Sequence, residues 1–186
     1  WFDGMPPLAA SPRDGDVVEA GRGRWRVVET AGHCRGHLCL HDAERRLLIS
    51  GDQVLPSISP NVSVISSRPA ADPLREFLAS LARLGECDAD TLVLPSHGRP
   101  FRGLHRRLAE LAGHHEQQLA ALRAFCTEPR TAFEVLPTMF RRVPQGFHRL
   151  LAMGEAVAHL NCLSGRGELR RLQDDDGIVR FVVSGG

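Results

Sequence analysis

Lysine and tyrosine are absent from this 186-residue sequence, and all 23 basic residues are arginine. Without lysine, Schiff-base chemistry and a P-loop that binds phosphate through its lysine are both excluded. Without tyrosine, no phenol can act as an acid or a nucleophile. The five cysteines form no Cys-x-x-Cys pair, so a disulfide framework and a structural zinc ribbon are disfavoured. This cysteine usage is typical of a reducing compartment, and we expect a cytoplasmic location.

The sequence also lacks a strong charge imbalance and a long hydrophobic run. Its formal net charge is +1, and 42% of its residues are hydrophobic. Balanced charge argues against a large contact surface for nucleic acid or a membrane. No apolar run approaches the ~20 residues needed to span a bilayer. The composition predicts a globular protein of one domain, or of one domain and a smaller part.

Apolar patterning predicts a mixture of strands and helices. Two β-hairpins are expected over 16–30 and 37–50, followed by a long loop rich in proline and serine over 53–72. Asp72 and Pro73 form an N-cap and first-turn signal for the helix that follows. The remaining expected elements, in chain order, are a helix to residue 84, a strand over 91–95, helices over 104–126, 132–142 and 146–162, and a hairpin over 168–183 with an Asp-Gly turn.

Three residues with side chains suited to metal binding stand beside glycines at the ends of apolar strand-like runs. They are His33, Asp52 and His97. Strand ends meet at one rim of a sheet, so these side chains are expected to converge. Imidazole and carboxylate suit Zn²⁺, Mn²⁺ or Fe²⁺, and a carboxylate can bridge two ions about 3.5–4 Å apart. Three ligands cannot complete two metal sites, so further donors are required.

The motifs around these residues resemble a known family. Gly32-His33-x-x-Gly36-His37, Leu48-Ile-Ser-Gly-Asp52 and Leu94-Pro-Ser-His97-Gly98 resemble the third, fourth and fifth metal motifs of the metallo-β-lactamase superfamily. The loop over 53–61 looks like that of the glyoxalase II-like branch, whose members end in a winged-helix-like domain. The sequence departs from the pattern at Cys34-Arg35, where Ser or Thr and Pro are commoner. It also contains no His-x-His-x-Asp-His stretch, the family's source of the other ligands.

The resemblance implies an α/β (α+β) fold. Residues 1–115 would form the C-terminal half of an αββα metallo-β-lactamase sandwich, and residues 116–186 a small winged-helix-like domain. The stretch that carries the other ligands would precede Trp1 in the intact protein. Adjacent His114 and His115 lie about 100° apart on a helix and cannot share a metal well, so we expect them at the surface or at a domain interface.

The resemblance further implies an enzyme, a metal-dependent hydrolase that cleaves an ester, thioester or lactone with metal-bound hydroxide as the nucleophile. His33 would complete the first metal site and His97 the second, and Asp52 would bridge both ions and be essential for catalysis. Two zinc ions are expected in the intact enzyme, with manganese or iron as alternatives. Because the His-x-His-x-Asp-His ligands are lacking, we expect this chain to bind metal weakly or not at all and to be inactive alone.

Two alternative functions remain open, a metal-dependent ribonuclease of the same superfamily and a non-enzymatic winged-helix module that binds nucleic acid. Residues 117–186 contain nine Arg against seven Asp and Glu, which is too even for strong phosphate neutralisation. The expected partner is therefore a small ester or thioester, not nucleic acid or a membrane.

A homodimer is also expected. An uncovered sheet face with Trp25, Val27 and Leu48 would bind a second copy. The alternative is that the N-terminal loop covers this face, with its apolar residues Trp1, Phe2, Met5 and Leu8.

Overall fold

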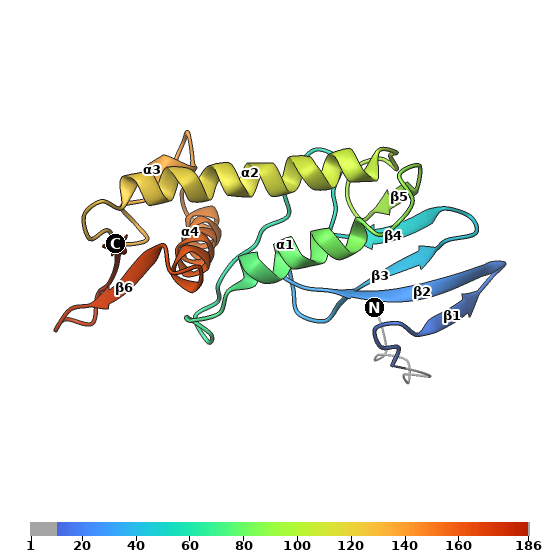
Figure 1. The fold of residues 1–186 in the computed structure, drawn as a ribbon, viewed down its shortest axis with the longest axis horizontal. Coiled ribbons are helices and arrows are strands. Elements are labelled where there is room, and N and C mark those ends of the chain that lie inside the picture. The colour runs from blue at the N-terminus through green and yellow to red at the C-terminus, as the bar shows by residue number, and fades with distance from the viewer. Residues whose placement is uncertain (1–10, 186) are drawn as a thin grey trace.

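The computed structural model describes residues 11–185, which fold into a five-stranded sheet, four helices and a separate hairpin (Figure 1). The sheet has the order β1-β2-β3-β4-β5. Its first four strands pair antiparallel, and β4 pairs parallel with β5. The strands of this sheet are β1 (Val17–Ala20), β2 (Gly23–Thr30), β3 (His37–Asp42), β4 (Leu47–Gly51) and β5 (Leu92–Pro95). Both predicted hairpins and the predicted fifth strand are confirmed.

Helix α1 (Pro73–Leu84) packs against the sheet, and α2 (Leu104–Phe125) runs from the sheet to the C-terminal part (Figure 1). The Asp72 side chain caps α1 by accepting a hydrogen bond from the Arg75 backbone N–H, and Pro73 occupies the first turn, as predicted. The apolar stripe of α1 buries Leu74, Phe77 and other residues in the core. This helix therefore covers one face of the sheet and anchors it to the core.

The C-terminal part contains α3 (Leu136–Met139), α4 (Phe147–Gly165) and the hairpin of β6 (Leu169–Gln173) and β7 (Val179–Val183). One cluster of buried hydrophobic residues extends from the sheet through α1, α2 and α4 to Phe181 in β7. The expected domain boundary at residues 115 and 116 lies inside α2. The division into two domains and the winged-helix assignment stay predictions.

The helix predicted over 132–142 is wrong, since only Leu136–Met139 are helical there. The Thr131 N–H and hydroxyl both donate to the Glu134 carboxylate, which closes a turn ahead of the helix. Pro137 lacks an N–H and would clash with a preceding carbonyl in a helix interior. In the structure Pro137 instead occupies the first turn of α3, where no such hydrogen bond is required.

The sheet face expected to be exposed is largely covered. Val27 and Leu48 are both fully buried within the chain, so that part of the expected dimer surface is wrong. The N-terminal residues offered as alternative cover, Trp1, Phe2, Met5 and Leu8, lie outside the described residues. The homodimer stays a prediction. No helix between residues 11 and 185 is long and apolar enough to cross a membrane.

The N-cap of α1 predicts how much Asp72 contributes to the stability of the protein. Replacing Asp72 with alanine removes the acceptor for the Arg75 N–H, and we expect the free energy of unfolding to fall by about 1 kcal/mol. Asp72→Asn keeps a side-chain acceptor and is expected to lose less than half as much. Urea denaturation followed by circular dichroism measures both, and equal losses would contradict the capping role.

Candidate metal centre

The three predicted ligands converge at one rim of the sheet. His33 lies in the turn after β2, Asp52 follows β4, and His97 follows β5. His33 Nε2 lies 3.7 Å from Asp52 Oδ2, and His97 Nε2 lies 3.4 Å from Asp52 Oδ1. The two imidazoles therefore face different oxygens of the same carboxylate. That arrangement matches a bridging carboxylate with one histidine on each side.

The protonation of the His33 ring is determined by its other nitrogen. His33 Nδ1 lies 2.9 Å from the backbone carbonyl oxygen of Asn61. Because a carbonyl only accepts hydrogen bonds, Nδ1 carries the proton, and in the neutral ring Nε2 keeps its lone pair. That lone pair is on the nitrogen that faces Asp52. A second hydrogen bond of this kind is how proteins orient histidines that bind metal.

Asp52 is hydrogen-bonded to the turn after β5, which also carries His97. The Ser96 hydroxyl donates a hydrogen bond to Asp52 Oδ1, and the Ser96 backbone N–H donates to the Gly51 carbonyl over 3.1 Å. The side chains differ in exposure, since His97 is 71% exposed, whereas His33 and Asp52 are 28% and 34% exposed. The centre is thus open to solvent on the His97 side.

Two buried polar side chains form hydrogen bonds that connect the ligand-bearing turns. Neither was predicted from the sequence. The Gln53 side-chain amide donates to the carbonyl of Ala31, and the Ser80 hydroxyl of α1 accepts from the Ala31 N–H. Ala31 lies two residues before His33, and Gln53 follows Asp52 directly. These bonds connect the two turns with α1. Sequence patterns gave no signal for them, because the partners are far apart in the chain.

Two glycines beside the ligands leave no space for a side chain. Gly32 has φ +104°, and a Cβ there would lie 2.3 Å from the Cβ of Phe77 in α1. Gly51 has φ +53°, and a Cβ there would lie 2.5 Å from the His37 ring. Positive φ is unfavourable for residues other than glycine. Glycine therefore allows each ligand-bearing turn to approach its support closely.

A pair of buried histidines joins α2 and α4. His115 of α2 and His159 of α4 are both fully buried, with His115 Nδ1 3.1 Å from His159 Nε2. His159 Nδ1 donates to the Glu155 carbonyl, so His159 Nε2 accepts from His115, and His115 Nε2 accepts from the Ser59 hydroxyl. His115 thus lies at a contact between helices, and His114 is exposed. This hydrogen-bonded row reaches the loop that contains Asn61.

Burial sets the protonation of this pair. Desolvation and the neighbouring histidines lower the pKa of His115 to about 3, and desolvation lowers the pKa of His159 to about 4. Both rings are therefore neutral in the folded protein at neutral pH. The sequence analysis missed the pair because His115 and His159 are 44 residues apart.

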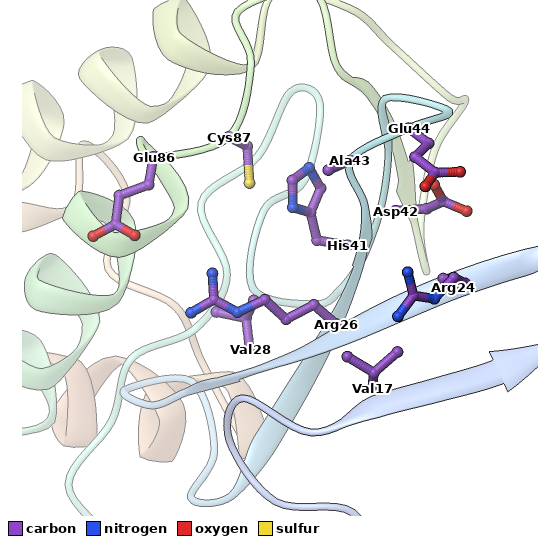
Figure 2. A pocket seen from close by; sticks show the side chains of 10 residues that line it. All are labelled: Val17, Arg24, Arg26, Val28, His41, Asp42, Ala43, Glu44, Glu86 and Cys87. Carbon is purple, nitrogen blue, oxygen red and sulfur yellow. The ribbon is translucent and has the colours of Figure 1, made fainter.

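A separate hollow of about 330 Å³ lies at the far end of β3 (Figure 2). Its lining includes Arg24, Arg26, His41 and Glu86. The His41 Nε2 atom is buried there and has no hydrogen-bond partner among residues 11–185. Arginines and carboxylates both line the hollow, so it has no clear preference for an anion or a cation. None of the three predicted ligands lines it.

The three predicted ligands supply too few donors for a complete metal site. Within the part of the chain that the structure describes, no group of three or more His, Cys, Asp and Glu side chains is arranged to hold an ion. Each pairing of one imidazole with one Asp52 oxygen supplies two donors, whereas a complete zinc site has four. The tautomer of His33 leaves Nε2 free to bind a metal, and Asp52 directs one oxygen toward each imidazole. The ligand roles of His33, Asp52 and His97 stay predictions.

Two family models match this chain. The "Metallo-beta-lactamase superfamily" family matches residues 4–97, and the "Metallo-beta-lactamase-like, C-terminal domain" family matches residues 119–184. The chain belongs to the metallo-beta-lactamase superfamily, whose members bind metal ions, commonly zinc and sometimes iron. The predicted family and the mixed α/β fold class are therefore confirmed.

Solved structures and curated proteins extend the comparison. A beta-lactamase domain protein from Burkholderia ambifaria is 46% identical, with a TM-score of 0.93 over 97% of this chain and 54% of its own. A metallo-beta-lactamase family protein from Thermus thermophilus is 32% identical, with a TM-score of 0.81 over 97% of this chain and 55% of its own. This chain therefore spans about half of each structure.

Two of the curated relatives have names that describe hydrolytic enzymes. "Acyl-coenzyme A thioesterase MBLAC2" from Gallus gallus is 34% identical over 60% of this chain and 39% of its own length. "Hydroxyacylglutathione hydrolase" from Fuscovulum blasticum is 30% identical over 50% of this chain and 34% of its own. This chain thus spans little more than a third of the length of these two relatives. Their names support a hydrolase at the level of the family.

The close packing of Gly32 generates a paired prediction. Gly32→Ala adds strain at positive φ and a clash with Phe77, so we expect the free energy of unfolding to fall by about 3 kcal/mol or more. Gly36 lies in the same turn at φ +66°, and a Cβ added there would have nothing within 4 Å. Gly36→Ala therefore carries the strain alone and should cost about 1–2 kcal/mol. Urea denaturation of both variants measures the difference, and equal losses would exclude the clash.

The buried histidine pair predicts a pH-dependent stability. An unfolded histidine takes up a proton near pH 6.5, but the folded pair does so only near pH 3 to 4. The pair's contribution to stability thus falls as the pH falls from about 6.5 to 4, by up to ~1.4 kcal/mol per pH unit for each histidine. Partly buried Glu155 acts in the opposite direction, because desolvation raises its pKa to about 7.

Urea denaturation between pH 4.5 and 7.5, with a chelator present, measures this slope. The double variant His115→Leu/His159→Leu is expected to remove the histidine contribution to this slope, whereas His148→Leu at an exposed position should leave the slope unchanged. An unaltered slope in the double variant would contradict the assignment.

Proposed function

We propose that this chain forms part of a metal-dependent hydrolase that cleaves a thioester. The observation that carries the proposal is the divided carboxylate of Asp52, whose two oxygens face the imidazoles of His33 and His97. Support for a thioester comes from the relatives named as an acyl-coenzyme A thioesterase and a hydroxyacylglutathione hydrolase. An ester or a lactone shares the same reacting carbonyl and remains within the proposal.

In this proposal each of the three residues has a separate role. His33 would bind one ion through Nε2, His97 would bind the other, and Asp52 would bridge both. When bound, the ions supply Lewis acidity that polarises the substrate carbonyl and lowers the pKa of a water molecule. Asn61 keeps His33 in the tautomer that leaves Nε2 available, and Ser96 orients the carboxylate of Asp52.

The complete site needs donors beyond these three residues. We infer that they come from a His-x-His-x-Asp-His stretch outside this sequence, that zinc is the metal, and that the active enzyme is the longer protein. We also retain the division into a sandwich part over 1–115 and a winged-helix-like part over 116–186, and a cytoplasmic location. The ribonuclease and nucleic-acid-binding alternatives are not favoured by any feature of the described residues.

Zinc titration of this chain tests the ligand assignment directly. Isothermal titration is expected to show weak binding, because each ion receives only two of its donors. His33→Ala and His97→Ala should each lower the affinity at least tenfold, or ~1.4 kcal/mol. His114→Ala removes an exposed histidine away from the centre and should change nothing. Tight binding of two ions to this chain, or equal effects of all three variants, would contradict the proposal.

Activity is tested in the longer protein loaded with zinc. Asp52→Ala removes the proposed bridge and should abolish hydrolysis of an acetyl thioester, whereas His114→Ala should leave it intact. Single-stranded RNA serves as the competing substrate. Cleavage of RNA without hydrolysis of any thioester would replace this proposal with the ribonuclease alternative.

A further inference from the structure

An apolar groove of about 420 Å³ lies between the β4–α1 loop and α4. Its hydrophobic lining comes from both sides, with residues of the loop facing residues of one side of α4. These residues are Val64, Ile65, Leu150, Leu151, Met153 and Val157. The proposed function described above does not involve this groove.

The lining contains no charged residue. Besides the hydrophobic side chains, only Ser63, Ser66, Pro69 and Gly154 contribute. Two of its large hydrophobic side chains are strongly exposed, Ile65 at 62% and Leu150 at 68%. Exposed apolar side chains gathered in one hollow indicate a binding surface for an apolar group.

Hydrogen bonds connect this groove to the candidate metal centre. The Asn61 carbonyl accepts from His33, and the Ser63 hydroxyl lies 2.6 Å from Asn61 Oδ1. The same hydroxyl lies 3.2 Å from the Leu151 carbonyl of α4, and the Val64 N–H donates to the Gly154 carbonyl over 3.0 Å. The groove thus begins two residues from the contact that orients His33.

The β4–α1 loop packs closely against α4 at Gly154, on one side of the groove. A Cβ at Gly154 would lie 2.8 Å from the Val64 carbonyl oxygen and 2.9 Å from the Ser63 Cβ. Glycine at this position lets the loop backbone rest directly on the helix. The loop backbone on one side of the groove is therefore packed directly against α4.

We propose that this groove binds the unbranched acyl chain of the thioester substrate. The inference rests on the proposed function and concerns only the acyl part of the substrate. Glutathione and coenzyme A both carry charged groups, which need charged partners that the lining lacks. A hydrocarbon chain needs only apolar surface. The chain would lie along α4 with its carbonyl end toward His33, Asp52 and His97.

Binding of free fatty acids to this 186-residue chain tests the groove without metal or catalysis. Isothermal titration with octanoate, decanoate and dodecanoate should show an affinity that rises up to about fourfold for each added methylene, the value for complete burial. An affinity that does not depend on chain length would overturn the proposal.

Two matched variants locate the binding. Leu150→Asp introduces a charge into the groove at an exposed position and should weaken dodecanoate binding at least tenfold without unfolding the chain. Ile178→Asp is the control, because Ile178 is 44% exposed and lies outside the groove. Thermal melts of both variants verify folding. Equal loss in both variants would show nonspecific binding and overturn the proposal.

Light scattering tests whether the groove binds a second copy of this chain instead of a fatty acid. A dimer that Leu150→Asp dissociates, in a chain that binds no fatty acid, would replace the proposal with self-association. A chain that remains monomeric and binds dodecanoate supports the acyl groove.

The longer zinc-loaded protein separates failure of the groove from failure of the proposed function. A kcat/KM that rises from acetyl to decanoyl thioesters, with the rise lost in Leu150→Asp, supports the groove. Equal kcat/KM for all chain lengths overturns the groove and leaves the hydrolase standing. Absence of hydrolysis, together with length-dependent binding of fatty acids, overturns the hydrolase and leaves the groove as a lipid-binding site.

Discussion

The hydrogen bond from His33 Nδ1 to the Asn61 carbonyl is the contact on which the candidate centre and its surroundings depend. On one side it leaves the Nε2 lone pair of His33 facing Asp52. On the other side it fixes the β4–α1 loop, whose Ser63 and Val64 contact α4. The orientation of His33 and the shape of the apolar groove therefore both depend on the position of the β4–α1 loop, which contains the Asn61 carbonyl.

Phe77 connects the same loop system to the helices. Its Cβ lies against Gly32, and its ring meets the His115 ring edge to face at a centroid distance of 5.4 Å. His115 in turn binds His159 of α4 and accepts from Ser59 of the loop. The turn that carries His33 is therefore supported by α1, which is itself packed on α2 and α4. Close packing of this kind is what holds ligand side chains within the tolerances that metal binding requires.

The open side of the centre agrees with the partial coverage of the relatives. His97 is mostly exposed, and Asp52 has no third His or carboxylate in place to complete either proposed metal site among the residues described. Structures with high similarity are about twice as long as this chain. In the proposed enzyme, the remaining ligands would come from residues outside this sequence.

The sequence by itself determined the elements, the family and the three candidate ligands, because strand alternation, the Asp72-Pro73 cap and the glycine-flanked motifs are local signals. It failed over 132–142, where apolar spacing suggested a helix that Pro137 limits to four residues. Only the tertiary structure decided that Gln53 and Ser80 meet at Ala31, that His115 pairs with His159, and that Leu150 faces the β4–α1 loop. These contacts join residues far apart in the chain, and their partners are selected by how helices pack on the sheet, which no local pattern specifies.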